Sequence, residues 1–355
     1  MRPARALIDL NALRHNLSAA KSGAPRSRVW AVVKANAYGH GLHRVWRAFD
    51  AADGLALLDI DTAASLREDG CSKPLLMIEG FFDEPELQLF TRHRLTAVVH
   101  HVEQIGMIEQ ARLTAPLDVY LKINAGMNRL GFRPGEGGMA LERLRASGKI
   151  GSLTLMTHFP DADGPRGVDG PLAAFDKFAQ GLALPVSAAN SAALLDFPQT
   201  HRDWVRPGIM LYGCSPFSDR PAHSIGVRPA MTVTSRIIAV QRLMPGERVG
   251  YAGLFTADRD MRLGVVAFGY ADGYPRHAAQ GTPVLVAGKR TGTLGRVSMD
   301  MLCVDLTDLP QAGVGSSVTL WGEGLSADEV AASASTVSYE LLCALSVRLP
   351  VDVVG

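Results

Sequence analysis

From Val29 to about Tyr212 the chain alternates short apolar runs, rich in leucine and β-branched residues, with longer segments whose apolar positions have helical spacing. Repeated βα units produce this alternation. The longer segments include expected helices at Asp61–Asp69, Val102–Leu113, Glu136–Ala146 and Pro171–Gly181. The apolar runs predict eight strands, at Trp30–Val33, Leu55–Leu58, Leu75–Ile78, Thr96–Val99, Asp118–Ile123, Ser152–Thr157, Pro185–Ala188 and Val205–Leu211.

Eight such units in about 185 residues are typical of a closed (β/α)8 barrel of parallel strands. A doubly wound parallel sheet is the structural alternative, although no Gly-x-Gly-x-x-Gly pattern follows the first strand. The pattern therefore favours an α/β chain that begins with a TIM-type barrel.

Beyond the Pro/Ser-rich stretch Ser215–Pro229 the pattern changes, and glycine turns separate β-rich segments with helical patches at Ala327–Ala334 and Ser338–Leu345. This change predicts two domains, a barrel over residues 1–222 and a mainly β domain over residues 223–355. The expected strands of the second domain are Met231–Met244, Leu263–Phe268, Pro283–Val286, Met301–Asp305 and Ser317–Trp321.

Composition and charge narrow the class of function. The chain has 355 residues, 47% of them hydrophobic, and its 36 basic and 35 acidic residues give a net charge of +1. This balance predicts neither a nucleic-acid partner nor a membrane partner and leaves small-molecule chemistry as the expectation. Four scattered cysteines without metal-ligand spacing, no secretory signal and no long apolar run predict free thiols, no metal site and a cytoplasmic location.

Lys34 stands at the end of the first apolar run and is followed by a glycine-containing loop. If the lysine is buried, desolvation lowers its pKa, and a neutral amine forms a Schiff base with an aldehyde. The position therefore points to carbonyl or pyridoxal phosphate (PLP) chemistry. The alternative is an ordinary solvated strand end.

Polar residues also follow the later strands, at the end of a barrel where catalytic side chains gather. Ser191 could bind a phosphate or serve only as a helix N-cap, and Gly208 would permit close backbone approach. The polar residues of this kind are Lys122 and Arg129 after the fifth strand, His158 after the sixth, Asn190 and Ser191 after the seventh, and Arg206 at the eighth.

Taken together, these segments resemble the alanine racemase family, whose members combine a PLP-binding barrel with a C-terminal β-domain. The resemblance runs from Ala6 to Tyr339 and so covers nearly the whole chain. The matching segments are Val33–Gly41, Asn124–Phe132, Thr157–Phe159, Ala189–Ser191, Arg206–Gly213, Val249–Tyr251, Gly269–Arg276 and Gly295–Met301.

The resemblance implies roles for the residues that carry the chemistry. Lys34 would bind PLP and act as a base on one face of the substrate Cα, with Tyr251 as the base on the other face. Arg206 would face the pyridine nitrogen, and Arg129 would bind the cofactor and the substrate carboxylate. His158 and Arg206 would form a cationic network that favours the Tyr251 phenolate.

Further roles follow from the same resemblance. Lys122 matches a lysine that carries a carbamate in many relatives, the alternative being an ordinary salt bridge. Ala252 departs from the family pattern, which often has glycine after the catalytic tyrosine. The remaining cofactor-binding residues would be Tyr38, Asn190, Ser191, Gly208, Ile209 and Tyr339, and the substrate mouth would be lined by Tyr270, Met299 and Asp300.

The implied activity is interconversion of L- and D-alanine, which would supply D-alanine for peptidoglycan, in a homodimer that shares its active sites. Three alternatives remain open at this point. One is a PLP racemase of broader small amino acid specificity. Another is a PLP decarboxylase, which would want an acidic partner where Arg206 stands. The third is a non-catalytic PLP-binding regulatory protein, which would lack the second domain.

Overall fold

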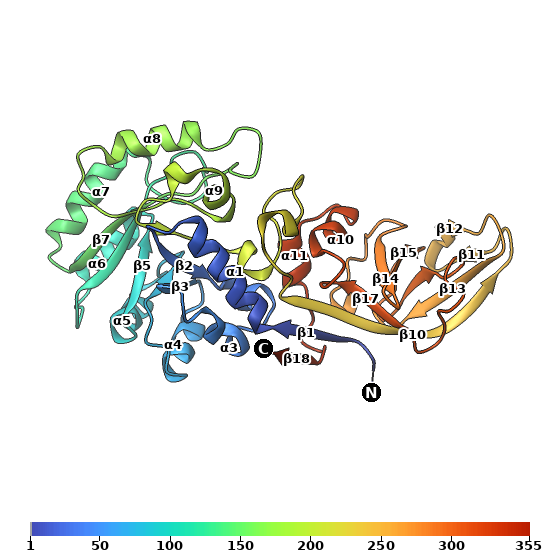
Figure 1. Cartoon of the computed structure of the whole chain (residues 1–355). Coiled ribbons are helices and arrows are strands. Elements are labelled where there is room, and N and C mark those ends of the chain that lie inside the picture. The colour runs from blue at the N-terminus through green and yellow to red at the C-terminus, as the bar shows by residue number, and fades with distance from the viewer. Residues whose placement is uncertain (1) are drawn as a thin grey trace. The chain divides into compact units, whose positions relative to one another are not determined.

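The computed structural model describes residues 2–355, which divide into two compact units. One unit, the barrel unit, comprises Leu17–Ala37 and Val45–Leu211. The other, the β unit, comprises the chain up to Asn16 together with Tyr38–Arg44 and Tyr212–Gly355. The barrel strands form one closed sheet, and the strands of the β unit form an eight-stranded sheet and a two-stranded sheet (Figure 1).

Eight parallel strands close into a barrel in the barrel unit (Figure 1). Each strand pairs with the next along the chain, and the last returns to the first through the Arg28–Trp204 register. The prediction of a barrel followed by a mainly β part is confirmed. The strands are β2 (Arg28–Val32), β3 (Gly54–Leu57), β4 (Leu75–Met77), β5 (Leu95–Val99), β6 (Leu117–Lys122), β7 (Ile150–Met156), β8 (Val186–Ser187) and β9 (Trp204–Val205).

The eighth strand is much shorter than the sequence predicts. Only Trp204–Val205 is extended, and the apolar residues that follow form the 3-10 helix Ile209–Tyr212. Pro207 has no N–H for a strand ladder, so the chain leaves the sheet there, although the Pro207 carbonyl still accepts the Val32 N–H at 3.1 Å. A continuous apolar run cannot distinguish a buried strand from a buried helical turn.

Helices connect the strands, and side-chain caps fix the starts of several of them. Asp59 accepts the Thr62 N–H at 2.7 Å, and Asp83 accepts the Glu86 N–H at 2.8 Å. Such caps satisfy N–H groups that have no partner inside the helix. The helices are α4 (Ile60–Glu68), α5 (Glu84–Arg92), α6 (Val102–Gln110), α7 (Pro134–Ala146), α8 (Asp169–Ala179) and α9 (Ser191–Asp196), while α1 (Leu10–Gly23), the short turn α2 (Lys34–Tyr38) and α3 (Leu42–Val45) have residues in both units.

The β unit is built on an eight-stranded sheet of order β13-β16-β15-β14-β17-β10-β1-β18. Its longest strand, β10 (Met231–Leu243), pairs with β1, β17 and β13 and is the long gold ribbon of Figure 1. The other elements are β1 (Arg5–Asp9), β13 (Met261–Val266), β14 (Pro283–Val286), β15 (Lys289–Leu294), β16 (Leu302–Asp305), β17 (Ser317–Trp321), β18 (Val351–Val354), α10 (Ala327–Ser333) and α11 (Ser338–Cys343).

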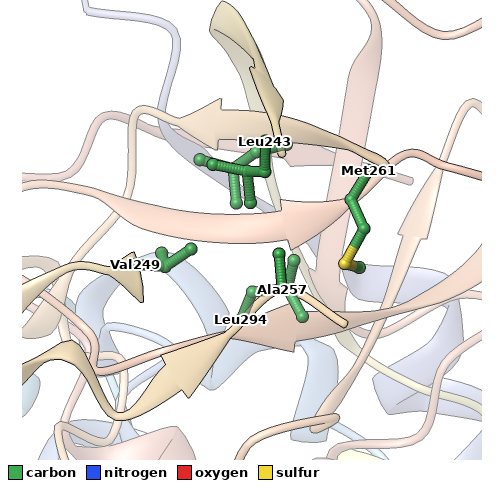
Figure 2. Packing of buried hydrophobic residues seen from close by; sticks show 6 residues of the cluster. Leu243, Val249, Ala257, Met261 and Leu294 are labelled. Carbon is green, nitrogen blue, oxygen red and sulfur yellow. The ribbon is translucent and has the colours of Figure 1, made fainter. Parts of the chain in front are cut away.

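A small separate ladder in the β unit carries a residue of the predicted site. The strands β11 (Arg248–Val249) and β12 (Phe255–Thr256) pair with each other and leave Tyr251 in the turn between them. Side chains from this ladder and from the main sheet pack into one buried cluster (Figure 2), which fixes the base of the turn. The buried cluster consists of Leu243, Val249, Ala257, Met261, Leu263 and Leu294.

Two further features of the fold bear on function. No helix within residues 2–355 is both long and apolar enough to cross a membrane. The four cysteines, Cys71, Cys214, Cys303 and Cys343, are free thiols, as the sequence predicts.

Candidate active site

The carboxyl ends of the barrel strands carry the polar residues that the sequence singles out. Lys34 follows β2, Lys122 is the last residue of β6, and His158 follows β7. Asn190 and Ser191 follow β8, and Arg206 comes directly after β9. Because all eight strands run parallel around a closed barrel, these residues lie at the same end of it.

Lys34 begins a turn of left-handed backbone. Ala35, Asn36 and Ala37 have φ of 52°, 53° and 54°, and Tyr38 continues at 50°. Each left-handed non-glycine residue costs roughly 1–2 kcal/mol, and strain of this kind is concentrated at functional sites. Of the two readings of Lys34, a buried lysine or a solvated strand end, the structure agrees with the second, because the turn carries Lys34 out of the strand and leaves it exposed while Val33 stays in the core.

Arg206 is a buried cation held by neutral acceptors. Its guanidinium donates to the Ser187 hydroxyl at 2.7 Å, to the Thr157 carbonyl at 2.7 Å and to the Ala188 carbonyl at 3.1 Å. Burial lowers the pKa of Arg206 to about 10, so the group stays charged at neutral pH. Three fixed acceptors orient the guanidinium without neutralising it.

His158 lies beside this cation, with its Nδ1 3.5 Å from an Arg206 nitrogen. Burial lowers the pKa of His158 to about 3, with further contributions from the positive charges of Arg206, Lys122, Arg129 and Lys34. The predicted cationic pair of His158 and Arg206 is therefore wrong, since only the arginine is charged at neutral pH. Because guanidinium cannot accept a hydrogen bond, Nδ1 faces it as the acceptor and Nε2 carries the proton.

Lys122 is buried at the end of β6. Burial lowers the pKa of its amine from 10.5 to about 8, and the charges of Arg206, Arg129 and Lys34 lower it further than Glu79 raises it. At pH 7 about a tenth of this amine is therefore unprotonated and able to act as a nucleophile, a far larger fraction than for an ordinary lysine.

Arg129 projects from a loop that folds back on β6. The Lys122 carbonyl accepts the Phe132 N–H at 2.9 Å, and the Phe132 carbonyl accepts the Asn124 N–H at 2.8 Å. Inside the loop, the Asn124 side chain accepts the Asn128 N–H at 2.9 Å. The closed loop thus fixes the backbone that carries Arg129, whose side chain is exposed.

The ends of β8 and β9 are joined at Ser191 and Gly208. Asn190 is the N-cap of α9, because its side chain accepts the Ala193 N–H at 2.9 Å. Ser191 is therefore not the cap that one reading of the sequence proposed. Its hydroxyl instead accepts the Gly208 N–H at 2.8 Å, next to the buried Ile209.

A second group of site residues lies in the β unit. The ring of Tyr38 stacks on Tyr212 with centroids 4.6 Å apart, and the Tyr339 ring is 6.0 Å from it. Burial, with a smaller effect of Cys343, raises the pKa of the Tyr38 hydroxyl. The fold thus brings together Tyr38 and Tyr339, two residues 301 positions apart in the sequence that are both expected to bind the cofactor.

Tyr251 is 68% exposed in its turn and is flanked by Gly250 and Ala252, with φ of 67° and 62°. Ala252, the departure from the family pattern, therefore adopts a conformation that glycine accepts more readily. Tyr270 and Met299 are also exposed, at 36% and 54%. Their loops are joined by the Tyr270 N–H, which donates to the Ser298 carbonyl at 3.1 Å.

Reasoning from the sequence missed the residues that hold these groups. Ser187 anchors Arg206, and its position inside the predicted strand Pro185–Ala188 gave a weak signal, since inward residues of a barrel strand are usually apolar. Asp272 is fully buried beside Tyr270. It belongs to the segment Gly269–Arg276, one of those that resemble the family.

A closed parallel barrel with an amine and a buried guanidinium at the carboxyl ends of its strands, followed by a mainly β unit with an exposed tyrosine, places the chain in the class of two-domain barrel proteins. Family models of the alanine racemase N-terminal and C-terminal domains match residues 8–216 and 230–353. The chain belongs to the alanine racemase family. It is an isomerase, and its activity is interconversion of the alanine enantiomers.

Individual relatives agree with this membership along the whole chain. The chain is 54% identical to a catabolic alanine racemase of Klebsiella aerogenes and covers 99% of both proteins. It is 55% identical to an alanine racemase of Nitrosospira multiformis, with 98% of each covered. The crystal structure of a biosynthetic alanine racemase from Pseudomonas aeruginosa matches with a TM-score of 0.98 and 45% identity over 100% of both chains.

Proposed function

We propose that the chain interconverts L- and D-alanine by a two-base mechanism that uses PLP, with Lys34 and Tyr251 as the bases. The observation that carries this proposal is the buried Arg206 cation, held by Ser187, Thr157 and Ala188 through neutral acceptors. A carboxylate at this place would favour decarboxylation or transamination, because it would let a cofactor ring hold charge for longer.

The residues at the end of the barrel fit PLP by their chemistry. Lys34 offers a primary amine for an aldehyde, and Arg206 offers a guanidinium for a ring nitrogen. Ser191 accepts the Gly208 N–H and so keeps its own O–H as a donor toward a phosphate. We assign Lys34, Tyr38, Arg129, His158, Asn190, Ser191, Arg206, Gly208, Ile209 and Tyr339 to cofactor binding.

When bound, PLP lowers the barrier to removing the substrate Cα proton by withdrawing electrons from that carbon. Arg206 donates a hydrogen bond toward the ring nitrogen but keeps its own proton, which favours brief carbanion character and hence racemisation. A direct test is the visible absorption of the purified protein with PLP, followed by a chiral assay of alanine. Absence of both signals would refute the proposal.

The two bases must act on opposite faces of Cα. We assign removal of the Cα proton of D-alanine to Lys34 and removal of the Cα proton of L-alanine to Tyr251. A tyrosine is a weak base at neutral pH unless a nearby positive charge favours its phenolate. We propose that Arg206 supplies this charge and that neutral His158 presents a proton from Nε2 to the phenolic oxygen.

Substrate recognition is proposed for four residues. Arg129 suits a carboxylate because its planar fork can donate two parallel hydrogen bonds. Tyr270, Met299 and Asp300 would form the wall that limits the substrate side chain to about the size of a methyl group. A broader racemase that accepts other small amino acids remains the second candidate, and competition between alanine and serine distinguishes the two.

Lys122 is proposed to carry a carbamate formed with CO2. The depressed pKa supplies a neutral amine, and the neighbouring Arg206, Arg129 and Lys34 that disfavour an ammonium would favour an anion. The carbamate would then orient Arg129. Mass spectrometry under native conditions, with and without bicarbonate, tests for the added CO2.

We propose a homodimer in which Lys34 of one chain works with the Tyr251 of its partner. Support comes from the exposed Tyr251, Tyr270 and Met299 of the β unit and from the two-fold closure that most homodimers use. Mixing inactive Lys34→Ala and Tyr251→Phe dimers tests this arrangement. Random exchange should restore roughly a quarter of the sites, whereas no recovery after verified exchange would refute the shared site.

The cellular role is proposed as D-alanine supply for peptidoglycan in the cytoplasm. Names among the relatives include both biosynthetic and catabolic enzymes, and racemisation can run in either direction. Rescue of a bacterium that requires D-alanine, by expression of this chain, tests the supply role. Failure to rescue, with active enzyme present in the cells, would contradict it.

A further inference from the structure

Asp272 is a fully buried carboxylate held by three donors. The Gly269 N–H donates to it at 2.9 Å, and the guanidinium groups of Arg2 and Arg348 donate at 2.8 Å. Burial alone would raise the pKa of Asp272, but the hydrogen bonds from these three donors hold it below its ordinary value. The carboxylate is therefore charged at neutral pH, and both of its oxygens accept hydrogen bonds.

The two arginines come from opposite ends of the chain and bind a second residue as well. Arg2 donates to the Asp300 carbonyl at 2.6 Å, and Arg348 donates to the Asp300 carboxylate at 2.6 Å. Two cations and two anions thus form one neutral cluster, which we call the terminal clamp. Its members are Arg2, Asp272, Asp300 and Arg348.

The terminal clamp joins two loops that are already in backbone contact. The Ala271 N–H donates to the Met299 carbonyl at 2.9 Å, in addition to the bond from Tyr270 to Ser298. A Cβ on Gly269 would come within 2.4 Å of the Met299 carbonyl oxygen, so only glycine permits this approach. One loop carries Tyr270, and the other carries Met299 and Asp300.

We propose that the terminal clamp sets the substrate selectivity of the enzyme by fixing the spacing between Tyr270 and Met299. This inference rests on the proposed function, because it takes these side chains as the wall of the substrate mouth. Arg2, Asp272 and Arg348 are positioning residues, since they act through the loops. Their removal widens the mouth and leaves the chemistry at the barrel end in place.

The rigidity of the two loops determines how strongly the enzyme discriminates between alanine and a substrate with a larger side chain. A rigid wall excludes a larger side chain by steric clash, whereas a mobile wall yields and admits it. Serine exceeds alanine by one hydroxyl group and is therefore the sensitive probe. Loosening either loop therefore raises kcat/KM for serine by a larger factor than it lowers kcat/KM for alanine.

The experiment compares Arg2→Ala and Arg348→Ala with Arg5→Ala as a matched control. Arg5 also joins the two ends of the chain, but it pairs with Asp352 at 2.9 Å on the exposed edge of the sheet. The ratio of kcat/KM for L-alanine to that for L-serine should fall about tenfold in the first two variants and should not change in the control. An unchanged ratio in both clamp variants, or an equal fall in Arg5→Ala, overturns the proposal.

Hydrogen exchange gives a readout that does not depend on activity. The Tyr270 and Ala271 amides should exchange at least about tenfold faster in Arg2→Ala and Arg348→Ala than in the wild type. Asp272→Asn should act in the same direction, because the amide replaces one acceptor oxygen by an NH2 donor and removes the negative charge that both arginines bind. Unchanged exchange at both amides in the arginine variants overturns the clamp.

The two proposals fail in different ways. If the wild type with PLP does not racemise alanine, the proposed function fails, while the exchange experiment still tests the clamp. If the wild type racemises alanine and the clamp variants keep its selectivity, only the clamp is wrong.

Discussion

Replacing Lys122 with methionine removes a partly charged amine from the interior of the barrel unit and should stabilise the chain in CO2-free buffer. Methionine has a similar length and no charge, so the packing around β6 is largely kept. The folded chain disfavours the ammonium form, as the pKa of about 8 shows against 10.5 for an exposed amine. The buried ammonium of Lys122 therefore lowers the free energy of unfolding, by an amount that depends on pH.

The size of the effect follows from linkage. A pKa difference of one unit corresponds to about 1.4 kcal/mol. The pKa of Lys122 falls from 10.5 to about 8 on folding, so the protonated lysine lowers the free energy of unfolding by about 3 kcal/mol at pH 7. A depressed lysine pKa means that this cost is complete below pH 8, decreases between pH 8 and 10.5, and disappears above that range. At pH 9.5 it is about 1.4 kcal/mol. The advantage of Lys122→Met should therefore fall by about half or more between pH 7 and 9.5.

Urea unfolding at the two pH values measures this difference, with circular dichroism and tryptophan fluorescence required to give the same transition. Lys177→Met, which alters an exposed lysine of α8, is the control and should show no such pH-dependent gain. Added bicarbonate should stabilise the wild type but not Lys122→Met if the carbamate forms. A Lys122→Met variant less stable than wild type at pH 7 in CO2-free buffer would refute the electrostatic reasoning.

Three other variants test separate features. Lys34→Ala should lose the visible band of lysine-bound PLP and slow racemisation at least about a thousandfold, and a borohydride-stable link at another lysine would contradict this. Asn190→Ala should lower the unfolding free energy by about 1 kcal/mol through loss of the α9 cap, with Asn190→Asp restoring it in urea titrations. Gly39→Ala should cost at least about 2 kcal/mol, because its Cβ would lie 2.1 Å from the Leu342 carbonyl oxygen at φ of 78°; a thermal midpoint equal to wild type would show that the contact relaxes.

Most of the fold was predictable because the barrel strands are short, apolar and buried, while the helices between them keep a helical period. The errors arose where that signal is ambiguous. Val205–Leu211 has apolar residues on both sides of Arg206, Pro207 and Gly208, so periodicity alone could not separate the two-residue strand from the 3-10 helix that follows it. The strand β1 was missed because its five residues run directly into helix α1.

The identity of the site residues was easier to predict than their electrostatic state. The order of polar residues after the strands pointed to Lys34 and Arg206, since strand ends converge in any parallel barrel. Sequence could not show that Lys34 is exposed by a left-handed turn or that His158 is neutral. Those properties depend on burial and on charges from distant segments, as does the terminal clamp, which joins Arg2 to Arg348.

The pairing of β1 with β18 has a consequence for how the protein is made. Ala6 and Val351 are partners in adjacent parallel strands although about 345 residues of chain separate them. A ribosome adds roughly 5–20 residues per second, so β1 waits for tens of seconds until β18 exists. The barrel strands pair mainly with their neighbours in sequence and can assemble during that interval. β1 can pair with β10 once Met231–Leu243 has been made, but its other edge stays open until β18 exists, and an open strand edge is a place where a nascent chain needs protection from aggregation.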